Sequence, residues 1–193
     1  GPHRLIGPGE SVNIVDPSLE ILGTLTETDR AYLAAMKEVG LRRVMLSYVE
    51  TAADVAEVRA LLPEAEIVLK IETQKGLAFA RRVGTAEGRL MAARGDLYVE
   101  VPRPHKIISA LRTIVQADPD AIVASRIFDR LAHHPVPESA DIGDVAFLLA
   151  LGYRTFMLGD VTCFDRDTVL EALALLQAVA GEFPEPDRSE IGL

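Results

Sequence analysis

One stretch decides the fold of this 193-residue chain: Ile67-Val68-Leu69-Lys70-Ile71-Glu72. Side chains alternate between the two faces of an extended strand, so Val68, Lys70 and Glu72 are expected on one face and the other apolar residues on the opposite face. An apolar strand that ends in this way presents a cation and a carboxylate together. We therefore interpret the stretch as a buried strand with a candidate site at its carboxyl end.

Strand-like and helix-like segments alternate along the rest of the chain. Further apolar strands are predicted over residues 43–49, 89–94, 121–125 and 155–158. Helices are predicted over residues 26–39, 51–62, 75–83, 106–116, 141–151 and 168–180. This alternation predicts right-handed βαβ units and a parallel sheet, and strands without polar alternation are typical of sheets covered on both faces. Both a doubly wound sheet and a (β/α) barrel fit the pattern.

The polar residues favour the barrel, because they fall at or just past the carboxyl ends of several predicted strands. They are Ser47, Lys70 with Glu72, Arg94 with Asp96, Ser125 with Arg126, and Asp160 with Thr162. In a (β/α) barrel these ends form the active site. No Gly-x-Gly-x-x-Gly motif follows the first strand, which argues against a dinucleotide-binding sheet. We predict an α/β fold, an incomplete or trimmed (β/α) TIM-type barrel with parallel strands.

The number of strands is too small for a closed barrel. The sequence shows five good βα units and one weak strand at Ser11–Asp16, whereas a TIM barrel has eight strands. We expect a single domain over residues 1–193, with an irregular segment over 1–24 that holds the weak strand and a frayed tail over 182–193. Open edges of an apolar sheet invite pairing, so we expect a homo-oligomer or a partner chain that covers the gap.

Composition excludes some classes of protein. The net charge of −9 and the pI near 4.9 argue against a nucleic-acid-binding surface. The longest apolar run, Val145–Leu151, is far shorter than a membrane span, so no membrane partner is expected. A single cysteine, Cys163, allows no internal disulfide, and we predict a cytoplasmic protein.

Glu72 and Asp96 are the candidate metal ligands. Carboxylate oxygens are the ligands that Mg²⁺ and Mn²⁺ prefer, and Lys70 beside them would suit an anionic substrate with several oxygens. The alternative is structural, with Lys70 and Glu72 as solvated rim charges and Gly95-Asp96 as a turn. The remaining polar candidates are expected on the surface or in loops: His105, His133, His134 and the stretch Asp165–Asp167.

Several motifs resemble the barrel domain of pyruvate kinase, over about residues 25–180. They are Leu25-Thr26-Glu27-Thr28-Asp29, Val44-Met45-Leu46-Ser47-Tyr48-Val49, Ala53-Asp54-Val55, Lys70-Ile71-Glu72, Ala93-Arg94-Gly95-Asp96-Leu97, Val99-Glu100-Val101-Pro102, Val123-Ala124-Ser125, Pro135-Val136-Pro137, Gly143-Asp144-Val145-Ala146 and Phe156-Met157-Leu158. Their order and spacing make the resemblance specific. It implies the carboxyl-terminal half of that family's barrel.

The resemblance also implies roles for individual residues. Glu72 and Asp96 would bind the divalent metal, and Lys70 would stabilise charge on the phosphoryl group or on an enolate oxygen. The backbone N–H groups of Gly95 and Asp96 would hold the substrate carboxylate, with Arg94 and Ser47 as further substrate-binding residues. Ser125 stands where the family has a threonine that relays a proton.

The chain departs from the family at identifiable positions. Arg126 replaces a glutamine and would clamp a phosphate or a carboxylate, since a guanidinium binds either in bidentate fashion. Tyr98 replaces a glycine, and Gly159-Asp160-Val161-Thr162 replaces Ser-Gly-Glu-Thr. The family's first barrel strands, its lid domain and its regulatory domain have no counterpart in the sequence. These departures leave ADP binding open.

Three functions follow as hypotheses. The first is a divalent-metal-dependent enzyme that acts on phosphoenolpyruvate, pyruvate or a related 2-oxo acid through a metal-stabilised enolate, as a transferase or a lyase. The second is an aldolase or lyase of the citrate-lyase type, which uses only the retained residues. The third is a non-catalytic relative that serves as a binding or scaffolding subunit.

Overall fold

A five-stranded parallel sheet forms the centre of the computed structural model, which describes residues 23–134 and 136–183. Each strand is hydrogen-bonded to the next strand along the chain, as successive βαβ units require. The strands are β1 (Arg43–Leu46), β2 (Glu66–Ile71), β3 (Arg89–Ala93), β4 (Ile122–Ala124) and β5 (Thr155–Met157). The predicted α/β fold, a partial barrel of parallel strands, is confirmed.

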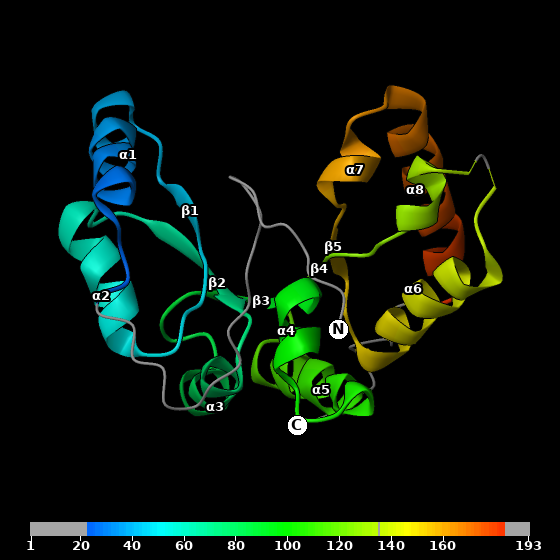
Figure 1. The fold of residues 1–193 in the computed structure, drawn as a ribbon, viewed down its shortest axis with the longest axis horizontal. Helices are drawn as coiled ribbons and strands as arrows, with labels where there is room; N and C mark the ends of the chain where they lie inside the picture. The colour runs from blue at the N-terminus through cyan, green and yellow to red at the C-terminus, as the bar shows by residue number, and fades with distance from the viewer. Residues whose placement is uncertain (1–22, 135, 184–193) are drawn as a thin grey trace, which may run out of the picture.

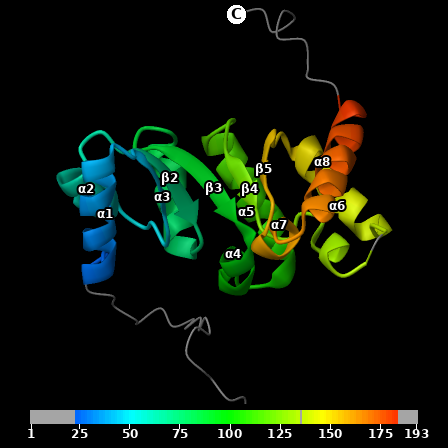
Figure 2. The ribbon, with the colours of Figure 1, turned by 90° about the horizontal axis from the view of Figure 1, so that it is seen from above.

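The helices follow the sheet as an arc. They are α1 (Glu27–Val39), α2 (Ala52–Leu61), α3 (Gln74–Val83), α4 (Arg94–Glu100), α5 (Ile107–Ala117), α6 (Ser139–Leu151), α7 (Asp160–Cys163) and α8 (Arg166–Gly181), with short 3₁₀ turns at Pro104–Lys106 and Asp129–Ala132. In Figure 1, α1 and α2 lie to the left of the strands, α3 to α5 below them and α6 to α8 to the right. Figure 2 shows the same succession from above. This is the layout of part of a (β/α) barrel.

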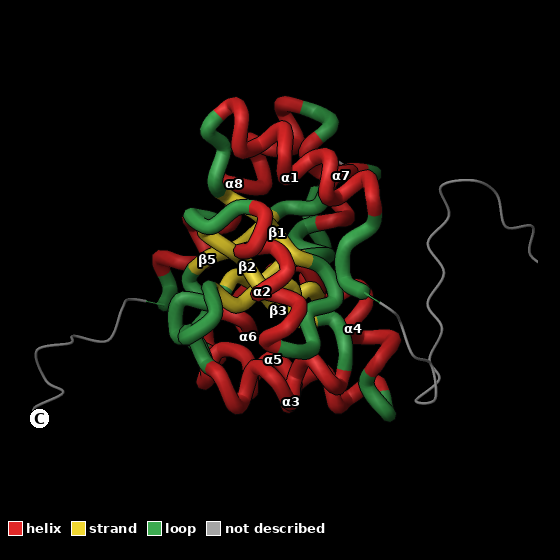
Figure 3. The backbone as a smooth tube through the Cα atoms, turned by 90° about the vertical axis from the view of Figure 1, so that its left-hand side faces the viewer, coloured by secondary structure: helices red, strands yellow, loops and turns green. Residues whose placement is uncertain are grey.

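The two faces of the sheet are buried to different extents. The face that meets the helices carries the main core, which includes Leu69 and Val123. Figure 3 shows the strands at the centre with α3 and α5 beneath them. The opposite face, which would line the inside of a barrel, has a small buried cluster of Met91, Ile122 and Ala124. The outer strand β1 leaves Met45 on this face 55% exposed.

Polar caps explain why the first helices begin where they do. Thr26 and Asp29 form a capping box at α1, and Thr51 and Asp54 form another at α2. Gly40, in the left-handed conformation, ends α1. The start and end predicted for α1 are therefore confirmed.

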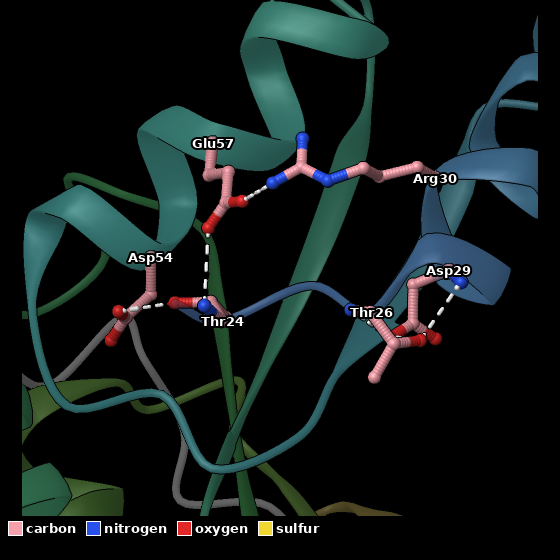
Figure 4. A network of polar contacts seen from close by, with 6 residues as sticks. All are labelled: Thr24, Thr26, Asp29, Arg30, Asp54 and Glu57. Atoms are coloured by element: carbon pink, nitrogen blue, oxygen red, sulfur yellow. Dashed lines mark hydrogen bonds and ion pairs between the residues drawn. The ribbon is translucent and has the colours of Figure 1, made fainter. Parts of the chain in front are cut away.

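A polar network joins the segment before α1 to helix α2 (Figure 4). The Thr24 hydroxyl donates to Asp54 Oδ1 at 2.7 Å, and the Thr24 N–H donates to Glu57 Oε2 at 3.2 Å. Arg30 of α1 forms an ion pair with the same Glu57. Asp54 therefore both caps α2 and holds the entry to α1, which fixes the first helix against the second.

All five strands end earlier than the sequence predicted, by one to three residues. Ser47, Glu72, Arg94, Ser125 and Leu158 were expected inside strands and lie just beyond them. The reason is local conformation: Ser125 has a φ of +70°, and Arg94 is the first residue of α4. Helix α8 begins at Arg166 instead of Thr168, because Asp165 accepts the Thr168 N–H at 2.8 Å as the N-cap. The expected strand at 11–16 and most of the expected tail lie outside the described residues.

Candidate functional site

Lys70 and Glu72 form the centre of a polar cluster at the carboxyl ends of β1 and β2. The Lys70 ammonium lies 2.9 Å from Glu72 Oε1 and donates to the Ser47 hydroxyl at 2.8 Å. Glu72 is almost fully buried, at 1% exposed, whereas the Lys70 side chain is 24% exposed. A buried carboxylate needs a partner of opposite charge, and Lys70 provides it while its side chain stays partly exposed.

Tyr48 joins this pair to Asp96, a role that the sequence analysis missed. Its backbone N–H donates to Glu72 Oε2 at 2.6 Å, and the negative charge of Asp96 acts on its phenol. Partial burial, followed by the negative charges of Asp96 and Glu72, raises the pKa of the Tyr48 phenol. Both carboxylates therefore act on one tyrosine. The sequence shows that Tyr48 directly follows Ser47 at the end of a predicted strand, but this position alone does not predict its pairing with Glu72.

The donor set fits a hard divalent cation. Glu72 and Asp96 offer carboxylate oxygens on neighbouring strand ends, and a carboxylate has further lone pairs beyond those used by Lys70 and Tyr48. Within the described ranges, no group of three or more His, Cys, Asp or Glu side chains forms a metal site. Mg²⁺ is commonly held by one or two protein carboxylates, with water and substrate oxygens completing its shell.

The Arg94 side chain is hydrogen-bonded to the backbone at the carboxyl end of β4. It is 8% exposed, and its Nη1 lies 2.8 Å from both carboxylate oxygens of Asp144. Its Nε donates to the carbonyls of Ala124 at 3.2 Å and Ser125 at 3.1 Å. These contacts commit the guanidinium to protein groups. The substrate-binding role predicted for Arg94 therefore stays a prediction, and the role visible in the structure is to hold the chain after β4.

Ser125 lies next to Gly95, and Arg126 lies near Tyr98. A Cβ placed on Gly95 would stand 3.6 Å from the Ser125 hydroxyl, so that hydroxyl faces the start of α4. Both Ser125 and Arg126 have positive φ, +70° and +57°. The exposed Arg126 guanidinium carbon lies 5.4 Å from the centroid of the Tyr98 ring. The predicted site residues from β3 and β4 are thus neighbours.

The remaining polar candidates were expected on the surface or in loops. His105, His133 and His134 are all exposed, as predicted. Asp165–Asp167 is also exposed, but the loop expected there is wrong, because Asp165 caps helix α8 and residues 166 and 167 are its first turn. Thr162, in the segment that departs from the family, is fully buried and its hydroxyl has no hydrogen-bond partner among the described residues.

No helix in the described parts of the chain has the length and apolar character for a membrane crossing.

Comparison with known proteins identifies relatives over most of the chain. Residues 4–164 match the family described as "Pyruvate kinase, barrel domain". The chain is 31% identical over 182 residues to a pyruvate kinase of Methanocaldococcus jannaschii, a match that covers 91% of this chain and 40% of that relative. It is 26% identical to one of Borreliella burgdorferi (89% and 37% covered) and 34% identical to one of Agrobacterium vitis (77% and 32% covered). The chain therefore spans at most two fifths of the length of these three relatives.

Proposed function

The chain belongs to the pyruvate kinase barrel family, and on that premise we propose that it binds a small 2-oxo acid or phosphoenolpyruvate and stabilises its enolate with a divalent metal. The metal would be Mg²⁺ or Mn²⁺, and Glu72 and Asp96 would hold it. Such an ion would polarise the substrate oxygens as a Lewis acid. This function needs only the residues at the carboxyl ends of β1, β2, β3 and β4, and these residues lie within the described part of the chain.

The observation that carries the proposal is a polar cluster around Lys70 and Glu72. Lys70 contacts Ser47 and Glu72, and Glu72 accepts from the Tyr48 N–H. The charge of Asp96 acts on the phenol of the same tyrosine. The Lys70 ammonium is fixed by bonds of 2.8 and 2.9 Å and is only partly exposed. A fixed cation in a partly desolvated site stabilises negative charge that develops on a substrate oxygen. We assign this role to Lys70, with the enolate oxygen as its target.

The remaining residues are assigned to binding and proton transfer. Ser125, beside Gly95, is assigned to relay a proton to the methylene carbon of the enolate, through water. Gly95 and Asp96 are assigned to the substrate carboxylate, since the absence of a side chain at Gly95 leaves room beside the Ser125 hydroxyl. The Ser47 hydroxyl accepts from the Lys70 ammonium, and its own O–H is assigned to donate to the substrate.

Proton exchange at the methyl group of pyruvate tests this function. In D₂O with Mg²⁺, the protein should catalyse exchange measured by proton NMR, and Lys70→Met should slow it by about 100-fold or more. Lys75, an exposed lysine that lies 3.8 Å from Glu50, provides the matched control, and Lys75→Met should leave the rate unchanged. No exchange with metal bound would rule out enolate chemistry and favour a scaffolding role.

A second assay separates the possible end reactions. Incubation with phosphoenolpyruvate, ADP and Mg²⁺ yields ATP if the chain transfers a phosphoryl group. Exchange at pyruvate without ATP formation favours a lyase of the citrate-lyase type, which passes through the same enolate. Both outcomes keep the assigned roles of Lys70, Glu72 and Asp96.

We also propose that a second copy or a partner chain covers the open face of the sheet. Within the described residues, β1 and β5 each pair with one neighbour, and Met45 is 55% exposed on the barrel-side face. Unpaired edges and exposed apolar side chains favour association. Light scattering that gives the mass of a monomer, 20.9 kDa, at micromolar concentration would contradict this.

A further inference from the structure

Two positions that depart from the pyruvate kinase pattern contact each other in the structure. Arg126 follows β4 and Tyr98 lies on α4. The resemblance to the family implies a glutamine and a glycine at these two positions. The guanidinium carbon of Arg126 lies over the Tyr98 ring, 5.4 Å from its centroid. The glycine of the family offers no ring at this position, so the two replacements form one new feature.

The backbone that carries Arg126 is held in an unusual conformation. Ser125 and Arg126 are consecutive non-glycine residues with φ of +70° and +57°. Such conformations persist when the surroundings impose them, and they are concentrated at functional sites. Here the surroundings include the buried guanidinium of Arg94, which donates to the carbonyls of Ala124 and Ser125 and pairs with Asp144 at 2.8 Å.

Arg126 lies on the β4 side of the proposed metal site. Ser125, its neighbour, faces Gly95, and Asp96 follows Gly95 on α4. Lys70 approaches from the β2 side. A guanidinium that stacks on a ring uses its face for that contact and keeps N–H donors at its edge. These donors suit a planar carboxylate in a bidentate arrangement.

We propose that Arg126, steadied by the ring of Tyr98, binds a second carboxylate of the substrate, so that the site prefers a dicarboxylic 2-oxo acid to the monocarboxylic acid of the same length. The inference rests on the proposed function, since the first carboxylate and the 2-oxo group are assigned to the metal and the Gly95–Asp96 segment. It goes further by naming the substrate class. Arg126 acts as a binding residue and Tyr98 as a positioning residue.

Matched pairs of 2-oxo acids test the preference by calorimetry in the presence of Mg²⁺. The pairs are 2-oxobutyrate with freshly dissolved oxaloacetate, and 2-oxopentanoate with 2-oxoglutarate. A diacid of at least one pair should bind about 10- to 100-fold more tightly than its monoacid, the range expected for a charged bidentate hydrogen bond. Arg126→Gln, which restores the family residue, should remove this preference and leave the affinity for the monoacid within about two-fold.

Two further variants separate positioning from charge. Tyr98→Phe keeps the ring and should keep the preference, whereas Tyr98→Gly should lose most of it. Arg130→Gln removes a neighbouring exposed arginine that pairs with Glu138, and should change neither affinity by more than about two-fold.

The outcomes distinguish the preference for dicarboxylic acids from the proposed function, which is metal-dependent binding of a 2-oxo acid. Equal affinity for the acids of both pairs would overturn the inference and leave the proposed function in place, provided that the monoacids bind in a metal-dependent way. No metal-dependent binding of any of the four acids would overturn both. If Arg126→Gln weakens phosphoenolpyruvate but neither diacid, the arginine serves the phosphoryl group and the dicarboxylate inference is wrong.

Discussion

The two ends of the sheet differ in how the chain turns. At the amino ends of the strands, the described residues with positive φ are glycines: Gly40, Gly84, Gly88 and Gly152. At the carboxyl ends they are other residues: Tyr48, Ser125, Arg126 and Phe128. Glycine adopts this conformation freely, whereas for other residues it costs about 1 to 2 kcal/mol of conformational free energy each. The amino ends thus turn without strain, and the carboxyl ends keep strain where the candidate site lies.

Charged groups show the same difference. At the amino end of β2, Glu66 pairs with Arg43, and both side chains are mostly exposed. At the carboxyl end of the same strand, Glu72 pairs with Lys70 and is 1% exposed. An exposed pair adds little to stability, whereas a buried charge is held only by its partners. In a (β/α) barrel this division is expected, because stability is built at one end and chemistry at the other.

The largest effect on stability is expected from Gly88→Ala, which tests whether the turns at the amino ends of the strands depend on glycine. A Cβ on Gly88 would lie 2.4 Å from the carbonyl oxygen of Ile67, and its φ is +149°. The substitution should lower the free energy of unfolding by about 3 kcal/mol or more, because clash and backbone strain add. Chemical denaturation measures the change.

Gly40→Ala is the matched control for that experiment. Gly40 also has positive φ, +76°, but a Cβ there would meet no atom within 4 Å. Backbone strain alone should then lower the free energy of unfolding by about 1 kcal/mol. Equal losses in the two variants would show that the close approach to Ile67 is unimportant.

Replacement of Glu66, the first residue of β2, and Glu72, which directly follows that strand, tests the difference between the exposed and the buried charge pair. Glu72→Gln should weaken Mn²⁺ binding by about 100-fold or more, because one of two carboxylate ligands is removed. Glu66→Gln should leave the affinity unchanged and alter the free energy of unfolding by less than about 1 kcal/mol. Calorimetric titration with Mn²⁺ gives both affinities, and circular dichroism verifies the fold. Unchanged Mn²⁺ affinity in Glu72→Gln would refute the metal assignment.

Two arginines that bridge a carboxylate and a carbonyl give the next comparison. Arg94, whose side chain is 9% exposed, holds the turn at Ser125, whereas Arg59, 41% exposed, bonds the Glu87 side chain and its carbonyl near the amino end of β3. Arg94→Lys should lower the free energy of unfolding by about 2 kcal/mol, because a lysine cannot reproduce the forked donors in a buried position.

Arg59→Lys should lower the free energy of unfolding by less than about 1 kcal/mol, since its pair is partly exposed. Arg94→Lys should also weaken pyruvate binding, because the turn that carries Ser125 relaxes, whereas Arg59→Lys should not. Urea denaturation and calorimetry measure the two effects. If Arg94→Lys lowers stability without any change in pyruvate affinity, its role is structural alone.

The sequence predicted the fold well because the signals were local. The pairs Thr26 with Asp29 and Thr51 with Asp54 predict the starts of two helices by their capping-box spacing. Both helices and both capping boxes are present. The apolar strand before Glu72 and its neighbours predicted the parallel sheet, which also formed. The strand ends were placed too late, because the left-handed backbone at Ser125 depends on contacts with Arg94, a residue 31 positions away.

The candidate site was predicted less completely than the fold. Lys70 and Glu72 are two residues apart, so their contact follows from strand geometry. Tyr48 was missed as a link because its interactions with Glu72 and Asp96 depend on how three strand ends converge. The partnership of Arg94 with Asp144, 50 residues away, was missed for the same reason. Such distant pairings leave no periodic signal in a single sequence.

The smallest effect on stability is expected from the deprotonation of two tyrosines at high pH, one at each end of the sheet. Burial raises the pKa of Tyr153, near the amino end of β5, and its hydroxyl donates to the Leu111 carbonyl at 2.8 Å. Partial burial and the charges of Asp96 and Glu72 raise the pKa of Tyr48. Folded chains hold both protons more tightly than unfolded chains, so this stability is present below the ordinary pKa of 10.0 and is lost as pH rises above it.

A divalent cation should separate the two tyrosines. Ca²⁺, which takes oxygen ligands and stays soluble in alkali, would neutralise Asp96 and Glu72 and so lower the pKa of Tyr48, with no effect on Tyr153. Phenolate absorbance during an alkaline titration, compared between the unchanged protein, Tyr48→Phe and Tyr153→Phe, assigns the shift to one residue. A Ca²⁺-dependent shift that persists in Tyr48→Phe would place the cation elsewhere. A shift lost only in that variant places the cation beside Tyr48, at the strained end of the sheet.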